Sequence, residues 1–66
     1  MAKGRRVVYP NDERGGWDVK KGVRARAIKH FGKKTDAVSY GKSICEKKGL
    51  NLVVYKQDGT VHKTIK

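Results

Sequence analysis

The chain has 66 residues and a formal net charge of +11, from 17 lysines and arginines against 6 aspartates and glutamates. A chain of this length forms one small domain with a thin core, which excludes a deep catalytic cleft between two lobes. Because such a charge excess repels itself in the compact state, we expect a polyanionic partner, and nucleic acid is the commonest.

Cellular location is indicated by what the chain lacks. The single cysteine, Cys45, cannot form an internal disulfide and is typical of a reducing cytoplasm. The segment 1–6 has no apolar run of the kind found in a secretory signal, and no stretch approaches the ~18 apolar residues that span a bilayer. We therefore expect a cytoplasmic protein with no membrane partner.

The N-terminal part is expected to be a flexible basic arm over residues 1–4, followed by one domain over residues 5–66. Arg5 and Arg6 at this boundary suit either insertion into a DNA minor groove or simple solvation. Residues 5–9 are rich in β-branched and aromatic side chains and are stopped by Pro10, which predicts a first strand.

Residues 17–19 and 23–27 alternate apolar and polar side chains, which predicts two further strands joined as a hairpin. A three-residue loop with Gly22 in the left-handed conformation would pair Trp17 with Ala25. Burial favours this register, since a one-residue slip would exchange the two faces. The side chains that it turns inward are Trp17, Val19, Val23, Ala25 and Ala27.

A helix of about 13 residues is predicted next, with Thr35 as its N-cap and Asp36 favourably placed in its first turn. Gly49 is expected to end it as a C-terminal glycine. One stripe at helical spacing is formed by Ala37, Val38, Gly41, Ile44, Cys45 and Lys48.

The last segment is a predicted hairpin, because residues 50–55 and 60–65 flank the turn sequence Asp58-Gly59. A two-residue loop pairs Leu52 with Ile65, Val54 with Lys63, Lys56 with Val61 and Tyr55 with His62. The whole order is β-β-β-α-β-β, an α+β fold in which one helix packs on one face of an antiparallel sheet. The other face would be left to solvent or a partner.

Three strings carry a family resemblance: GGWDV at 15–19, FGKKTDAV at 31–38 and GLNLVVYKQDGTV at 49–61. With them the chain resembles a widespread family of short bacterial and phage proteins, catalogued as a conserved domain of unknown function, DUF2188. The matching positions are Trp17, Val19, Phe31, Thr35, Ala37, Leu52, Val54, Asp58 and Gly59. The resemblance implies a small α+β fold and brings no assigned activity.

Cations dominate the candidate binding residues. In the predicted register Arg24 and Arg26 face outward beside Asp18, and Lys29, Lys33 and Lys34 follow. Arginine offers a planar fork for phosphate and lysine a mobile point charge. The alternatives are a solvated strand face and a surface for an acidic protein.

Aromatic side chains could add base stacking on the same sheet. Tyr55 and His62 beside Lys63 suit such a role, but they equally suit an ordinary cross-strand pair. Trp17 is expected in the core. The full predicted nucleic-acid-binding set is Arg5, Arg6, Arg24, Arg26, Lys29, Lys33, Lys34, Tyr55, His62 and Lys63.

Other chemistry finds little support in the sequence. Residues 41–43 read Gly-Lys-Ser but lack the preceding glycine of a phosphate-binding loop and fall in the predicted helix. His30, Cys45 and His62 lack the paired spacing of zinc ligands. No carboxylate pair and no nucleophile with a base stands out, so we expect neither an enzyme nor a cofactor.

The sequence therefore predicts a small nucleic-acid-binding protein that grips phosphates electrostatically, with little sequence selectivity. The alternative is a phage or bacterial accessory or inhibitory protein that docks on an acidic protein surface. Exposed sheet edges would suit strand addition or a homodimer in that case.

Overall fold

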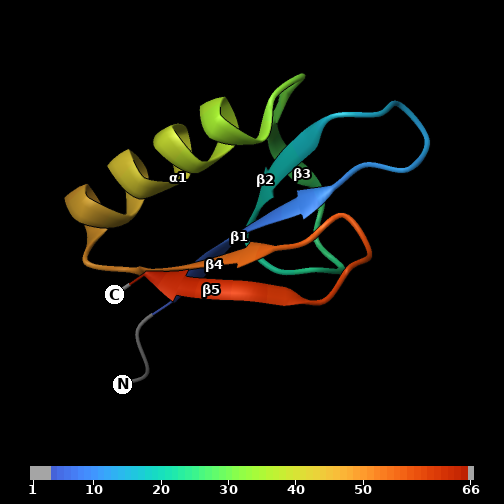
Figure 1. The fold of residues 1–66 in the computed structure, drawn as a ribbon. Coiled ribbons are helices and arrows are strands. Elements are labelled where there is room, and N and C mark those ends of the chain that lie inside the picture. The colour runs from blue at the N-terminus through green and yellow to red at the C-terminus, as the bar shows by residue number, and fades with distance from the viewer. Residues whose placement is uncertain (1–3, 66) are drawn as a thin grey trace.

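The computed structural model describes residues 4–65, so most of the expected basic arm, residues 1–3, lies outside the described residues. Its elements are β1 (Arg5–Pro10), β2 (Trp17–Lys20), β3 (Ala27–Phe31), α1 (Lys34–Lys48), β4 (Asn51–Tyr55) and β5 (Val61–Ile65). They form one five-stranded sheet in the order β3-β2-β1-β4-β5, with α1 across one face (Figure 1). The α+β class and the order of elements are confirmed.

The sheet is mixed, because its central strands β1 and β4 run parallel while the other neighbours pair antiparallel. The expectation of an all-antiparallel sheet is corrected by this one pairing. A parallel pair needs a long crossover connection, and here β2, β3 and α1 together supply it.

The core lies between α1 and the sheet. Alternate strand positions bury their side chains completely at Val8, Val19, Leu52 and Val54, and α1 contributes Ala37 and Cys45. Trp17 keeps only 8 % of its surface exposed, as predicted for a core residue. Gly41 lets the helix approach closely, since a Cβ there would lie 2.8 Å from Leu52 Cδ1.

The helix begins two residues earlier than a Thr35 N-cap would allow. Lys33 is its N-cap, without a side-chain hydrogen bond, and the Ala37 amide donates to the Lys33 carbonyl at 3.2 Å. Thr35 therefore lies inside the first turn, and its prediction as N-cap is wrong. Gly49 ends the helix in the left-handed conformation (φ 67°), as predicted.

The pairing of β2 with β3 differs from the predicted hairpin. Trp17 pairs with Phe31, and Gly22 has no positive φ, so the predicted three-residue loop with Gly22 in the left-handed conformation is wrong. This register places the Phe31 ring 5.3 Å from the Tyr40 ring, which buries more apolar surface than Ala25 could. Residues 21–26 form the connection, and Val23, Ala25 and Ala27 lie outside the buried core.

The sheet face away from α1 is partly covered. Val7, whose neighbour Val8 belongs to the helix-side core, is nevertheless fully buried. The connection between β2 and β3 runs along this side of the sheet (Figure 1), and Lys20 Nζ donates to the Val23 carbonyl across it at 3.4 Å. The expectation of a face left open to solvent therefore holds only in part.

The C-terminal hairpin pairs Leu52 with Ile65 and Val54 with Lys63, as predicted. Beyond Val54 the register shifts at a bulge, so Tyr55 pairs with Val61 rather than with His62. An extra residue in one strand re-aims the side chain next to it. The predicted cross-strand pairs of Tyr55 with His62 and of Lys56 with Val61 are corrected accordingly.

Candidate functional site

A groove runs between the N-terminal half of α1 and the edge strand β5. The helix contacts β1, β2, β3 and β4, and β5 lies beyond β4 in the sheet, farther from the helix axis (Figure 1). The resulting hollow has a volume of about 460 Å³. It is lined by Lys34, Thr35, Val38, Ser39, Lys42, Val54, His62 and Lys63, and is called the basic groove below.

The helical wall of the basic groove follows from helix geometry. Side chains three or four positions apart lie above one another on the same helix face. Lys34, Val38 and Lys42 form one such row, and Thr35 with Ser39 forms the next. The wall therefore carries two cations and two hydroxyl groups around an apolar floor.

The strand wall is formed by Lys63 and by His62, which the β5 bulge displaces from its predicted partner. Lys34 Nζ lies 3.2 Å from His62 Nδ1 and 4.9 Å from the centroid of the Trp17 ring. An ammonium group can only donate, so Nδ1 of His62 accepts and carries no proton. The Lys34 ammonium is thus held between an imidazole and an indole face, which attracts cations.

Positive charge controls the protonation of His62. The Lys34 ammonium lowers the pKa of His62 below its usual value, with smaller contributions in the same direction from burial, Lys63 and Lys56. The imidazole is therefore neutral at pH 7. A further positive charge in the groove is disfavoured until an anion enters it.

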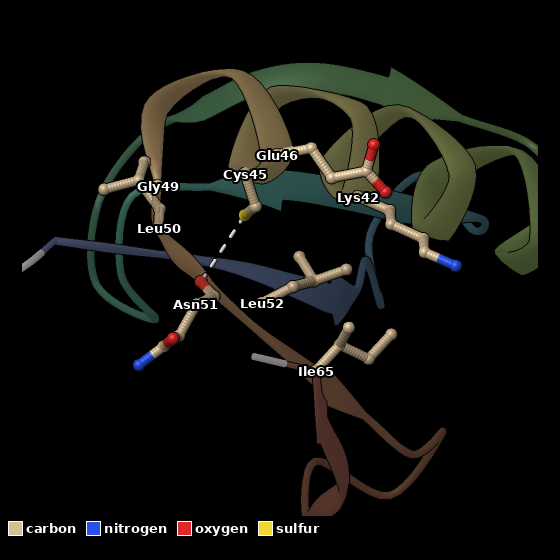
Figure 2. Close-up of a pocket in the computed structure, with 8 residues that line it drawn as sticks. All are labelled: Lys42, Cys45, Glu46, Gly49, Leu50, Asn51, Leu52 and Ile65. Carbon is tan, nitrogen blue, oxygen red and sulfur yellow. Dashed lines mark hydrogen bonds between the residues drawn. The ribbon is translucent and has the colours of Figure 1, made fainter.

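Toward the C-terminal half of α1, the surface beside the basic groove becomes more apolar. Lys42 also borders a second hollow of about 390 Å³, whose walls include Leu50, Leu52 and Ile65 (Figure 2). Cys45 Sγ points into it and donates to the Asn51 carbonyl at 3.5 Å. Burial raises the pKa of the Cys45 thiol against a weaker opposing effect of Arg6, so the thiol stays protonated.

The sequence comparison covers almost the whole of the chain. A family model described as an uncharacterized protein conserved in bacteria, DUF2188, matches residues 5–66. The chain belongs to DUF2188. No curated protein and no solved structure matches it. The family resemblance that the sequence motifs indicated is confirmed. Because this family is uncharacterized, the function of this DUF2188 protein has to be inferred from its own residues.

Of the predicted binding residues, the fold of this DUF2188 protein brings Lys34, His62 and Lys63 together in the basic groove. Sequence reasoning missed Lys42, Thr35 and Ser39, although the four-residue steps from Lys34 through Val38 to Lys42 and from Thr35 to Ser39 are a helical signal. The missing information was the position of β5 beside that helix face.

The predicted arginine strand does not exist in this DUF2188 protein. Arg24 and Arg26 are exposed in the connection between β2 and β3, which runs on the side of the sheet away from α1. Lys29 is exposed on the opposite edge strand, β3, and Lys33 is exposed at the helix N-cap. These residues do not form the single patch that the predicted hairpin implied.

The remaining predicted residues lie elsewhere on the DUF2188 fold. Arg5 begins β1 at the end of the sheet near the C-terminus of α1, and Arg6 Nη1 donates to the Arg5 carbonyl at 3.0 Å. Tyr55 packs edge-on against Tyr9, with ring centroids 4.9 Å apart. By strand alternation from Val54 in the core, Tyr55 belongs to the face opposite the basic groove.

Acidic groups neutralise little of the positive charge. Within residues 4–65, the one side-chain ion pair of 4 Å or less joins His30 Nδ1 and Asp18 Oδ1 at 2.6 Å. Asn11 Nδ2 donates to the other Asp18 oxygen at 3.0 Å. The expectation that Asp18 lies beside arginines is therefore wrong, and the lysines and arginines of this range form no ion pair with a carboxylate of the same range.

Two features are absent from the described part of the chain. No helix there is both long and apolar enough to cross a membrane. The same residues contain no group of three or more His, Cys, Asp or Glu side chains that could hold a metal ion.

Proposed function

We propose that this DUF2188 protein binds nucleic acid by seating backbone phosphates in the basic groove. The observation that carries the proposal is the convergence of Lys34, Lys42 and Lys63 on one hollow that no carboxylate lines. Ammonium groups bind phosphate oxygens as point charges, and the hydroxyls of Thr35 and Ser39 add neutral donors. The net charge of +11 supplies the long-range attraction.

Binding of this kind is mostly electrostatic and weakly sequence-selective. Lysine ammonium groups recognise the phosphate backbone, whereas base identity is read by side chains that reach base edges. The lining of the basic groove holds no arginine, asparagine or glutamine that could make a bidentate base contact. Discrimination then depends on the shape of the strand. We place this activity in the bacterial cytoplasm, where the reduced Cys45 also fits.

Affinity measured against salt tests the proposal directly. Fluorescence anisotropy would follow labelled duplex DNA, single-stranded DNA and RNA at two or more salt concentrations. If ~5 phosphates are neutralised, the slope of log affinity against log salt is about −4 to −5 for duplex DNA. Absence of binding to all three ligands at low salt overturns the proposal.

Two variants that lose the same number of charges test whether nucleic acid binds in the basic groove. Replacing Lys34, Lys42 and Lys63 by Gln removes three charges from the groove, whereas replacing Lys21, Lys47 and Lys48 by Gln removes three from exposed positions elsewhere. We expect the groove variant to lose about tenfold or more in affinity, with a salt slope reduced by about 3. Equal losses in the two variants would assign binding to diffuse charge and overturn the groove.

A second candidate is docking on an acidic protein, which the sheet edges favour. The outer strands β3 and β5 each pair on one side only within the described sheet. They also carry exposed apolar side chains, Ile28 at 41 % and Val61 at 53 % of their surface. Strand addition uses such edges. Pull-down from a nuclease-treated bacterial lysate separates the two candidates, because a partner protein would survive the nuclease and a nucleic-acid bridge would not.

A further inference from the structure

His62 occupies an unusual position among cations. It faces Lys34 and Lys42 across the groove from α1, Lys63 on its own strand and Lys56 at the end of β4. Among the acids of the neighbouring elements, Asp36 and Glu46 of α1 do not line the groove. Asp58 in the β4–β5 turn accepts hydrogen bonds from Thr60. The imidazole accepts a hydrogen bond from Lys34 while it is neutral.

A bound phosphate would reverse the electrostatic preference of His62 for its neutral form. Its negative charge between Lys34 and Lys63 would replace the repulsion that keeps His62 neutral with an attraction that favours the imidazolium form. A protonated imidazole donates from both ring nitrogens and can contact a phosphate oxygen. The Lys34 ammonium has three donors, so it can turn one of them from Nδ1 to the same phosphate.

We propose that the basic groove is a proton-coupled phosphate site, in which a phosphate seated between Lys34 and Lys63 draws a proton from solvent onto His62. The groove then binds phosphates more tightly as the pH falls. This inference rests on the proposed function, since the ligand is the phosphodiester backbone of a nucleic acid. His62 is a ligand contact whose charge the ligand itself induces.

The sign and the pH range of the effect follow from linkage. Well above both midpoints His62 is neutral with and without ligand, and affinity is at its lower limit. Well below both midpoints it is charged in both states, and affinity reaches its upper limit. Between them affinity rises as pH falls, by tenfold for each pH unit that separates the free and bound midpoints.

The chain offers a direct observation, because it contains two histidines that lie on opposite faces of the sheet. The probe is an oligothymidylate without terminal phosphates, which has no group that titrates between about pH 5 and 8. Nuclear magnetic resonance would follow both imidazoles through this range with and without the probe. We expect the His62 midpoint to move upward by about one pH unit on binding. The imidazole of His30 is hydrogen-bonded to Asp18 on the opposite face of the sheet, so its resonance should not shift when the probe is added.

Affinity measurements on His62→Gln complete the test. The unmodified protein should bind the oligothymidylate about fivefold more tightly at pH 5.5 than at pH 7.5, after any pH dependence that His62→Gln also shows is subtracted. His62→Gln should lose this difference, whereas Thr64→Gln, an exposed position on the same strand, should keep it. Circular dichroism would check that the variants are folded.

The outcomes separate this inference from the proposed function. Binding with an unmoved His62 midpoint, or with the same pH dependence in His62→Gln, overturns the proton coupling and leaves nucleic-acid binding in place. Absence of binding at every pH overturns both.

Discussion

Alternating strands around a glycine-containing turn predict both the β2–β3 and the β4–β5 hairpins, yet only β4–β5 keeps part of its predicted register. At the β4–β5 turn Asp58 accepts hydrogen bonds from the Thr60 amide at 3.0 Å and the Thr60 hydroxyl at 2.7 Å, and these bonds lower the pKa of Asp58. Gly59 supplies the positive φ of 88°. These contacts define the turn, and beyond the bulge beside it the predicted pairs of Val54 with Lys63 and of Leu52 with Ile65 are kept.

The connection between β2 and β3 also contains a turn, in which the Ala25 amide donates to the Gly22 carbonyl at 3.0 Å, but this turn does not give the predicted register. Gly22 does not adopt a positive φ, and residues 21–26 separate the strands. The register is instead set at the far end of the hairpin, where Phe31 packs on Tyr40 and His30 meets Asp18. Long-range packing therefore decides the register wherever the turn does not.

This difference also decides where the cations go. On the β4–β5 side the fixed pairing and its bulge hold His62 and Lys63 against α1. On the β2–β3 side the connection of residues 21–26 carries Arg24 and Arg26 on the side of the sheet away from that helix (Figure 1). The β4–β5 hairpin forms one wall of the basic groove, whereas the arginines of the β2–β3 connection lie outside it.

The largest expected effect comes from Gly16, at the far end of the β2–β3 hairpin. A Cβ there would lie 2.3 Å from the Phe31 carbonyl oxygen, and φ is already +76°. We expect Gly16→Ala to lower the free energy of unfolding by about 3 to 5 kcal/mol, from backbone strain plus the clash. Urea titration followed by fluorescence of the single tryptophan, Trp17, would measure it.

Gly15→Ala is the matched control, because Gly15 has nearly the same φ of +75° but no atom within 4 Å of the added carbon. It should show the conformational strain alone, about 1 kcal/mol. Equal costs at both positions would mean that the contact with Phe31 does not set the hairpin register.

The next largest effect is expected at Asp18, which is 5 % exposed and bonded to both His30 and Asn11. Asp18→Ala leaves both partners without their acceptor, and we expect a loss of about 2 to 3 kcal/mol. Asp18→Asn should retain one of the two hydrogen bonds and lose less. Thermal melting would record the difference, at about 4 to 8 °C per kcal/mol for a domain of this size. A harmless Asp18→Ala would show that this polar pair does not hold β3 to β2.

The sequence predicted those features of the fold that depend on nearby residues. Alternation placed Trp17 and Val19 in the core, and helical spacing placed Ala37 and Cys45 there. These positions survive the wrong β2–β3 register, because Trp17 keeps the same face whether it meets Ala25 or Phe31.

The remaining features depend on contacts between distant segments. The parallel pairing of β1 with β4 joins strands far apart in the chain, so no turn sequence between them predicts it. The basic groove needs both that pairing and the bulge that turns His62 toward Lys34. A one-residue bulge cannot be predicted from the alternation of apolar and polar residues alone. For this reason the sequence identified Lys34, His62 and Lys63 as binding residues but missed Lys42.

A smaller effect is expected at Tyr55, on the face opposite the groove. Tyr55→Leu removes the edge-on contact with Tyr9, and we expect a loss of about 1 kcal/mol in the free energy of unfolding. Because one strand in the groove does not reach that face, affinity for single-stranded DNA should stay within twofold of the unmodified protein. Anisotropy titrations under conditions where the variant is fully folded would show this. A tenfold loss of affinity would instead place base stacking on Tyr55.

The smallest effect is expected for the arginines that the sequence alone placed in the binding surface. Replacing Arg24 and Arg26 by Gln removes two charges from the connection on the side of the sheet away from the groove. At 0.1 M salt, charges separated by more than about 10 Å are largely screened, so we expect affinity to fall by less than about threefold. The salt slope should change by less than about 1. Replacing Lys34 and Lys63 by Gln, which removes the same charge, should lower the slope by about 2. If the arginine pair lowered affinity and slope as much as the lysine pair does, phosphates would have to contact the β2–β3 connection. The nucleic acid would then lie across both sides of the sheet, and the β2–β3 connection would share the site with the β4–β5 hairpin.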